Sequence, residues 1–399
     1  MHRLLPLAAL LIAAQSPGPK PPVPIASRDP GRFAIAPDAE ARWVPFDLTP
    51  GNQVRFIMTV DGRPATAILD TGVSFSVLSR GFAGLEPKRV RAGGEASTIG
   101  GAVPIGWVPT AVLELGGVTR TGGGLVVATL PALATGSAAP VDLLVGRDLL
   151  ARHALDIDYP GRRFRLLPSG RLPFRGAVAP LRVSATRRVY ETELRLGGRR
   201  VRPVIVDTGD GSPVTVTRAH WQAVSLAVLP TTSALSYGLA GPVIHDLAIA
   251  PEIGLGALTI RNVEVRIEPA DGFSGKVGVA GRIGSGLFGR RRVLLDPGAG
   301  RMVFGPGPAV DVGPVRSTSG LLVGILPDRL RVLHVMRSGP AAASGWKDGD
   351  LICAVDSVPV TAAYPASPQA RWTVGDPGRV VALRTCAGVE RSLTLKRFY

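Results

Sequence analysis

Short apolar runs that end in turn-forming residues recur along the chain. Residues 67–69 (Ala-Ile-Leu) lead directly into the tripeptide Asp-Thr-Gly at 70–72, and residues 204–206 (Val-Ile-Val) lead into the same tripeptide at 207–209. Short apolar runs are typical of buried strands, and Asp and Gly favour the turns that follow them. The pattern predicts a mainly β chain in which one strand-and-turn unit occurs twice.

The repeat extends beyond the tripeptide. Leu-Val-Gly at 144–146 and Arg-Ile-Gly at 282–284 open two similar stretches, so that 137 positions separate the two aspartates and 138 separate Gly146 from Gly284. Matching offsets of this kind indicate an internal duplication. We therefore expect two homologous lobes.

Each copy also carries a Gly-rich turn between the tripeptide and the later glycine. These turns lie at 97–101 (Ser-Thr-Ile-Gly-Gly) and 237–241 (Tyr-Gly-Leu-Ala-Gly), and strand-like residues flank both of them. Gly permits the backbone angles of tight reversals. Both turns are predicted to be tips of β-hairpins.

In their order along the chain, these elements resemble the retropepsin-like aspartic proteases, specifically bacterial members with two fused lobes, over residues 45–308. The resemblance implies a two-lobed, pepsin-like acid-protease fold and an endopeptidase whose catalytic pair is Asp70 and Asp207, one from each lobe. In that family the pair holds a water that attacks a peptide carbonyl. Two aspartates that share a proton cannot both ionise cheaply, so one acts as general base and the other, protonated, as general acid. This chemistry requires neither a metal nor a cofactor.

The residues around the aspartates take roles in the same reading. Thr71 and Thr208 carry hydroxyls that cross-link the two turns in the family, while Gly72 and Gly209 let backbone N–H groups approach the carboxylates without a Cβ in the way. The two hairpin tips would act as flaps that bend over a substrate and exclude water. The predicted flap residues are Ile99, Gly100, Gly101, Gly238, Leu239 and Gly241.

Two other interpretations stay open from the sequence. Each Asp-Thr-Gly is an ordinary turn, or the chain keeps the fold without activity and serves as a peptide-binding or scaffold protein. Val73 and Asp210 follow the two glycines, where the family usually has Ala, Ser or Thr. Asp210 either faces the pair as a third carboxylate, or points to solvent or caps its own turn.

A Gly/Pro-rich linker at 305–314 precedes a different C-terminal segment. Ser-Gly-Pro-Ala at 338–341 and Asp-Gly-Asp-Leu-Ile at 348–352 resemble the helix start and strand start of a bacterial PDZ domain. The resemblance implies a small α+β domain that captures an extended chain or a C-terminal carboxylate by strand addition.

In such a domain, N–H groups around Gly320, Leu321 and Leu322 would hold the carboxylate of the peptide ligand. Pro365 and Pro368 interrupt the segment where the second helix is expected. A purely structural role for this domain therefore stays open.

The N-terminal segment has the pattern of an export signal. Residues 1–3 carry positive charge, residues 4–14 are apolar and residues 15–16 are small and polar. The apolar run is too short to span a bilayer, and no later apolar segment reaches about 20 residues, so no stable membrane span is expected. We expect an exported protein, periplasmic or secreted.

The expected divisions of the chain are a signal peptide at 1–16, a Pro-rich segment at 17–44, protease lobe 1 at 45–170, protease lobe 2 at 171–308 and a PDZ-like domain at 309–399.

Composition adds little about partners. The net charge of +16 arises from 46 basic and 30 acidic residues, and the basic residues are spread over the whole chain rather than gathered in a run, so no nucleic-acid partner is expected. The expected partners are a peptide or protein substrate and a peptide ligand of the PDZ-like domain. Cys353 and Cys386 both lie in that domain, where an oxidising compartment would permit one disulfide, although the sequence does not give their separation.

Overall fold

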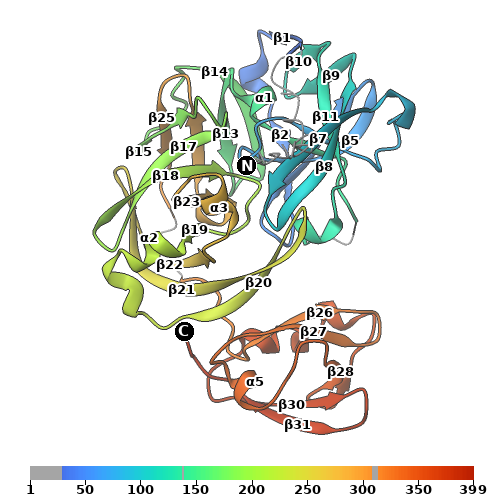
Figure 1. Cartoon of the computed structure of the whole chain (residues 1–399), viewed down its shortest axis with the longest axis vertical. Helices are drawn as coiled ribbons and strands as arrows, with labels where there is room; N and C mark the ends of the chain where they lie inside the picture. The colour runs from blue at the N-terminus through green and yellow to red at the C-terminus, as the bar shows by residue number, and fades with distance from the viewer. Residues whose placement is uncertain (1–28, 137–138, 308–312) are drawn as a thin grey trace, which may run out of the picture.

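The computed structural model describes residues 29–136, 139–307 and 313–399, and the described chain is mainly β (Figure 1). The expected signal peptide and the expected boundary at 308/309 lie outside these residues. Two large sheets and a third sheet between them form the main body, and a fourth sheet belongs to a C-terminal module (residues 313–399). No helix in the described ranges is long and apolar enough to cross a membrane.

The first large sheet carries the first Asp-Thr-Gly. Its strands, in pairing order, are β1 (Arg32–Ile35), β10 (Val118–Thr121), β9 (Val112–Leu115), β4 (Val54–Val60), β5 (Arg63–Leu69), β12 (Leu143–Val145), β6 (Val77–Ser79), β11 (Gly124–Ala128), β8 (Gly101–Pro109) and β7 (Arg91–Thr98), with β3 (Asp47–Leu48) beside β4.

The second large sheet carries the second Asp-Thr-Gly. Its strands, in pairing order, are β16 (Arg182–Val183), β17 (Tyr190–Leu196), β18 (Arg199–Asp207), β23 (Gly281–Gly284), β19 (Val214–Thr217), β22 (Leu258–Glu268), β21 (Gly241–Leu255) and β20 (Thr232–Gly238).

Seven strands follow the same pairing order in both sheets. The series β4-β5-β12-β6-β11-β8-β7 corresponds to β17-β18-β23-β19-β22-β21-β20. In each series the strand that leads into the tripeptide pairs in parallel with the strand that ends near the later glycine, β5 with β12 and β18 with β23. Because these strands are central and their apolar residues are fully buried, both aspartates stand at the ends of well-fixed strands.

A third sheet, the shared sheet, joins the two halves of the main body. Its strands, in order, are β15 (Ala177–Pro180), β25 (Arg301–Phe304), β24 (Arg292–Asp296), β13 (His153–Asp158), β14 (Arg163–Pro168) and β2 (Val44–Pro45). The antiparallel pair β13–β24 crosses from one half to the other. On it, the fully buried Asp156 accepts hydrogen bonds from the Nε atoms of Arg165 (2.9 Å) and Arg292 (2.8 Å), so the buried carboxylate is paired from both halves.

Helices in the described chain are short. The α-helices are α1 (Arg147–Leu150), α2 (Arg218–Gln222), α3 (Phe273–Lys276), α4 (Ser285–Phe288) and α5 (Pro340–Ala343). The 3₁₀ helices are η2 (Ala39–Ala41), η3 (Pro87–Arg89), η4 (Ala132–Thr135), η5 (Ser225–Val228), η6 (Tyr364–Ala366) and η7 (Pro368–Val374). The last two lie where Pro365 and Pro368 were expected to interrupt a longer helix.

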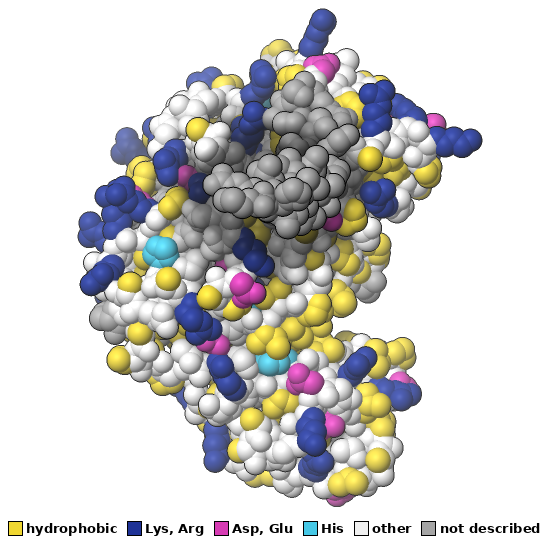
Figure 2. Space-filling view, in the orientation of Figure 1, with side chains coloured by type: hydrophobic (Ala, Val, Ile, Leu, Met, Phe, Trp, Pro, Cys, Tyr) yellow, Lys and Arg dark blue, Asp and Glu magenta, His cyan; other side chains and the backbone are white. Residues whose placement is uncertain are grey.

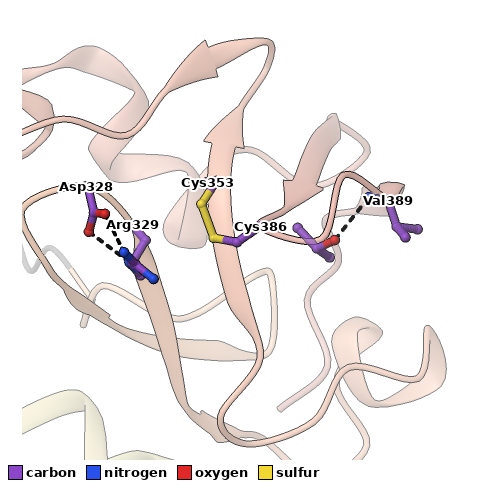
Figure 3. The surroundings of a disulfide bond; sticks show 6 residues. Asp328, Arg329, Cys353, Cys386 and Val389 are labelled. Atoms are coloured by element: carbon purple, nitrogen blue, oxygen red, sulfur yellow. Dashed lines mark hydrogen bonds and ion pairs between the residues drawn. A yellow bond between two sulfur atoms is a disulfide. The ribbon is translucent and has the colours of Figure 1, made fainter.

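The C-terminal module has its own sheet and core. Its strands, in order, are β26 (Leu321–Ile325), β27 (Leu330–Val335), β28 (Leu351–Val355), β30 (Val380–Thr385) and β31 (Glu390–Thr394), with β29 (Val358–Pro359) beside β28. The core is built around Leu330, Trp372 and Leu383, all fully buried. A disulfide joins Cys353 on β28 to Cys386 just after β30 (Figure 3).

The module packs against the base of the β20–β21 hairpin (Figure 1). Leu247 of β21 is buried against Met336 and Tyr399 of the module. Ser233 Oγ lies 2.8 Å from His334 Nε2, and Arg337 forms an ion pair with Asp246. The contact is therefore apolar at its centre and polar around it.

Candidate active site

The two Asp-Thr-Gly turns meet where the large sheets face each other. Asp70 comes directly after β5, and Asp207 is the last residue of β18. Each of the two side chains is 8% exposed. Each carboxyl lies against the glycine of the other turn, and the two are close enough for each to change the pKa of the other. Residues separated by 137 positions in the sequence are thus brought into direct contact.

The threonines cross-link the two turns. Thr71 Oγ1 donates to the carbonyl of Val206 (2.7 Å) and accepts from the N–H of Thr208 (3.1 Å). Thr208 Oγ1 in turn donates to the carbonyl of Leu69 (2.8 Å) and accepts from the N–H of Thr71 (3.0 Å). Both threonines are fully buried, so the four hydrogen bonds satisfy backbone groups that water cannot reach.

The glycines allow the carboxyls to approach. A Cβ added at Gly72 would overlap the carboxyl of Asp207, and one added at Gly209 would overlap the carboxyl of Asp70. The N–H of Gly72 donates to Asp70 Oδ1 (3.0 Å), and the N–H of Gly209 donates to Asp207 Oδ1 (3.0 Å). Each glycine therefore holds its own aspartate and makes room for the other.

The proximity of the two carboxyls changes their protonation. Burial first, and then the charge of Asp207, raises the pKa of Asp70 well above its usual range. Burial also raises the pKa of Asp207, and the carboxylate of Asp210 acts in the same direction, while Arg282 acts against both. Because both carboxyls cannot ionise at low cost, the pair retains one proton at a pH where isolated aspartates have lost theirs.

Asp210 is buried beside the pair and does not point to solvent. It is 8% exposed, and its carboxylate accepts from the N–H (2.9 Å) and Oγ (2.7 Å) of Ser212, so it also caps its own turn. Arg282 Nε lies 3.1 Å from Asp210 Oδ2. Although burial acts to raise it, Arg282 and Arg266 hold the pKa of Asp210 below its usual value. Asp210 thus lies beside the pair as a third carboxylate and also caps its own turn, the two roles that the sequence offered as alternatives.

The two predicted flaps are β-hairpins that meet at their tips. β7 and β8 turn at Ile99 and Gly100, and β20 and β21 turn at Leu239 and Ala240. The N–H of Ala240 donates to the carbonyl of Ile99 (3.3 Å). Gly100 and Gly101 have φ values of +94° and +144°, and Gly241 has +122°, angles that favour glycine.

A cleft of about 440 Å³ lies below the flaps and contains the two aspartates. Ile99, Gly238 and Leu239 form part of its roof. On the side of the first large sheet, the lining includes the apolar residues Ile68, Val73, Ile105, Val126, Ala128 and Leu144. The cleft can therefore hold an extended chain with an apolar side chain beside the carboxyl pair.

The predicted carboxylate-binding residues of the C-terminal module lie at the start of β26, at an edge of its sheet. The N–H of Gly320 donates to Ser317 Oγ (3.1 Å), and the N–H of Leu321 donates to Ser319 Oγ (3.0 Å). Leu322 is partly exposed. Two of the N–H groups predicted to bind a ligand thus have partners within the chain.

No group of three or more His, Cys, Asp or Glu side chains within the described ranges is arranged to hold a metal ion. Lys and Arg side chains are scattered over the face seen in Figure 2, on the main body and on the module alike.

Two residues beside the pair did not stand out in the sequence. Gln53 Nε2 donates to the carbonyls of Ala134 (2.9 Å) and Gly209 (3.1 Å), and so connects η4 to the second tripeptide turn. Arg282 reaches within 3.9 Å of Asp207. The signal for Arg282 was available, since a charged residue stands in an otherwise apolar strand where the first copy has Leu144. Nothing in the sequence around Gln53 indicates its contact.

Residues 56–149 match the sequence model of the aspartyl protease family. The matched segment contains Asp70 and the first flap, and the second Asp-Thr-Gly lies outside it. No curated protein matches the chain. At this coarse level, the match indicates a hydrolase with proteolytic function that acts on peptides or proteins.

Proposed function

We propose that the protein is an aspartic endopeptidase in which two fused, retropepsin-like lobes each supply one catalytic aspartate. The observation that carries the proposal is the contact between the Asp70 and Asp207 carboxyls, fixed by the reciprocal hydrogen bonds of Thr71 and Thr208. Ordinary turns have no need of such a cross-link, and two buried carboxyls in contact are costly for a fold that makes no use of them.

In the proposed reaction, one member of the pair is ionised and takes a proton from water while the oxygen of that water bonds to the peptide carbonyl carbon. The other member, protonated, donates its proton to the carbonyl oxygen. The hairpin tips close the cleft above the reacting groups and limit the entry of other water. The preferred substrate carries an apolar side chain next to the scissile bond, because the cleft wall from the first large sheet is apolar.

The export signal and the C-terminal module complete the proposal. We place the protein outside the cytoplasm, periplasmic or secreted, where the Cys353–Cys386 disulfide is stable. The module would act as a PDZ-like recognition domain for a substrate or partner. Its exposed β26 edge supports strand addition, although the N–H groups of Gly320 and Leu321 would have to exchange their serine partners for a ligand carboxylate.

Hydrolysis of short unstructured peptides by the full chain tests the proposal. Asp70→Asn and Asp207→Asn are each expected to lower kcat/KM by at least about 10³-fold while the protein stays folded, because an amide cannot exchange the proton. Asp47→Asn is the matched control, since this carboxylate is exposed on β3.

Full activity in either active-site variant would contradict the one-pair mechanism. If the unaltered protein bound peptides in the cleft and cleaved none between pH 3 and pH 8, the alternative of a catalytically inactive peptide-binding or scaffold protein would replace the proposal.

A further inference from the structure

A buried network of charges lies behind one member of the carboxyl pair. Arg282 on β23 is 4% exposed, with its Nε atom 3.1 Å from Asp210 Oδ2 and 3.9 Å from Asp207 Oδ2. Its Nη1 atom lies 2.7 Å from Glu268 Oε1 and 2.9 Å from Ser274 Oγ. The guanidinium is therefore held at both ends and cannot turn away from the pair.

The positions that correspond to this network in the first half of the main body are apolar. The sheet registers give the correspondence: Arg282 pairs with Ile205 as Leu144 pairs with Ile68, and Glu268 pairs with Thr217 as Ala128 pairs with Ser79. Three charged residues of the network, Asp210, Glu268 and Arg282, thus correspond to Val73, Ala128 and Leu144 in the first half.

The turn-anchoring carboxylate is also placed differently in the two halves. In the first half Asp148 of α1 accepts from the N–H (2.8 Å) and Oγ (2.7 Å) of Ser76. In the second half Asp210 takes that role toward Ser212, directly beside Asp207. A carboxylate moved next to the pair needs a cation beside it, and Arg282 is that cation.

We propose that Arg282 is a positioning residue that makes Asp207 the ionised member of the pair and leaves the proton on Asp70. The proposal rests on the proposed function for its catalytic meaning, although the position of the proton can be measured without any hydrolysis. A fixed cation stabilises the charged form of the nearer carboxyl, and the shared proton then resides on the farther one.

The other charged groups that face Asp207 do not reverse this order. Asp70 faces it from the opposite turn, Asp210 lies on its own turn, and Arg266 and Glu268 extend from β22. His245 on β21 is neutral, because burial first, and then Arg266, lowers its pKa to about 3. The carboxylate of Asp210 opposes ionisation of Asp207, but Asp210 forms ion pairs with Arg282 and Arg266, which offset its negative charge.

The assignment gives each aspartate one role in each half of the reaction. The Asp207 carboxylate accepts a proton from water as the water oxygen bonds to the carbonyl carbon, and Asp70 gives its proton to the carbonyl oxygen, which yields a neutral gem-diol. Asp207 then gives its proton to the amide nitrogen as the C–N bond breaks. One hydroxyl of the gem-diol returns a proton to Asp70, so the pair is restored.

The ionisation of each carboxyl can be measured alone in the full chain with ¹³C-labelled aspartate. In Asp70→Asn the remaining carboxyl is Asp207, and in Asp207→Asn it is Asp70, so each resonance is assigned by difference. We expect Asp207 to titrate at least about one pH unit below Asp70, which is a tenfold difference in ionisation. Equal midpoints, or the reverse order, would overturn the proposal.

The contribution of Arg282 is isolated in the Asp70→Asn background by isosteric changes. Asp210→Asn is expected to lower the midpoint of Asp207, because Arg282 then acts on Asp207 alone. Adding Arg282→Gln and Glu268→Gln removes the cation together with its other carboxylate partner, and is expected to raise the midpoint of Asp207 by at least about one unit. Arg282→Lys keeps the charge and should leave the midpoint low.

The low-pH limb of kcat/KM, measured with both aspartates present, should follow the same sequence of shifts. If the titration midpoint of Asp207 is the same with and without the Arg282 change, Arg282 has only a structural role and the proposal is wrong. Shifts in the titration without any hydrolysis by the unaltered protein would instead contradict the proposed function and retain this inference.

Discussion

At the scale of single residues, the buried carboxyl pair lowers the stability of the folded protein at neutral pH. Asp70 and Asp207 are buried, in contact and hydrogen-bonded by their own turns, and burial is the main reason that their pKa values are raised. A raised carboxyl pKa means that the folded state holds a proton that the unfolded state releases. The pair should therefore weaken the fold as the pH rises.

The pH dependence of stability follows from this difference. Asp70 ionises near its usual value of 3.8 in the unfolded chain and at a higher pH in the folded one, so stability is lost as the pH rises from about 4 through the raised pKa. Asp70→Asn is expected to raise Tm at pH 7 by roughly 2–4 °C for each kcal/mol relieved, and to leave Tm unchanged below pH 3.5.

Thermal unfolding followed by circular dichroism at pH 3.5, 5 and 7 gives the comparison, with Asp47→Asn as the exposed control. A lower Tm of Asp70→Asn at pH 7 than of the unaltered protein would show that the carboxyl supports the fold rather than burdening it.

Residue identity predicted part of this site and not the rest. Asp70, Asp207 and their glycines could be found because one tripeptide occurs twice after buried strands. Arg282 was visible only as a charged residue in an otherwise apolar strand. Its contact with Asp207 could not be predicted, because that contact depends on the strand pairing and register that make Leu144 its counterpart. Asp210 was noticed as unusual, but its direction required the position of Arg282.

At the scale of elements, the two flap hairpins close the site by meeting each other. Gly238 lies against Ile99, so that a Cβ on Gly238 would overlap the Ile99 carbonyl. Glycines at both turns made hairpin tips predictable from the sequence. Their mutual contact was not, since it depends on how the two large sheets face each other through the shared sheet.

Gly238→Ala should separate the flap tips without disturbing the core. We expect kcat/KM to fall by roughly tenfold or more, because the flaps would no longer exclude water from the cleft. The urea midpoint should change little, because Gly238 is buried at a flap tip and not in the hydrophobic core. Ser236→Ala on the same strand is the control, because Ser236 is only half-buried. Unchanged kinetics in Gly238→Ala would mean that the tips need not meet during the reaction.

At the scale of the whole molecule, the C-terminal module packs against one of the two flap hairpins. It contacts β20 and β21, the hairpin whose tip lies over Asp70 and Asp207, and makes its apolar contact through Met336 and Leu247. Displacement of the module should therefore change the motion of that flap. Although the sequence placed the module after a linker, it contained no sign of this contact.

Met336→Asp should release the module, because a carboxylate would be buried without a partner. We expect a larger radius of gyration in small-angle X-ray scattering and a change in kcat/KM of several-fold for a short peptide. The fluorescence of Trp372, in the core of the module, shows whether the module itself stays folded. Arg337→Ala is the control, since its exposed ion pair with Asp246 contributes only about 0–1 kcal/mol. A compact Met336→Asp variant would contradict the importance of the apolar contact.

The shared sheet has a consequence for the time course of synthesis. Strand β13 pairs with β24, whose residues are added to the chain about 140 positions later. Because synthesis adds 5–20 residues per second, the edge of β13 stays without its partner strand for on the order of ten seconds. Asp156 is without Arg292 for the same time. During that interval the nascent first half exposes an unpaired strand with apolar neighbours. A ribosome paused between the two halves would prolong the period in which such edges can pair with those of another chain.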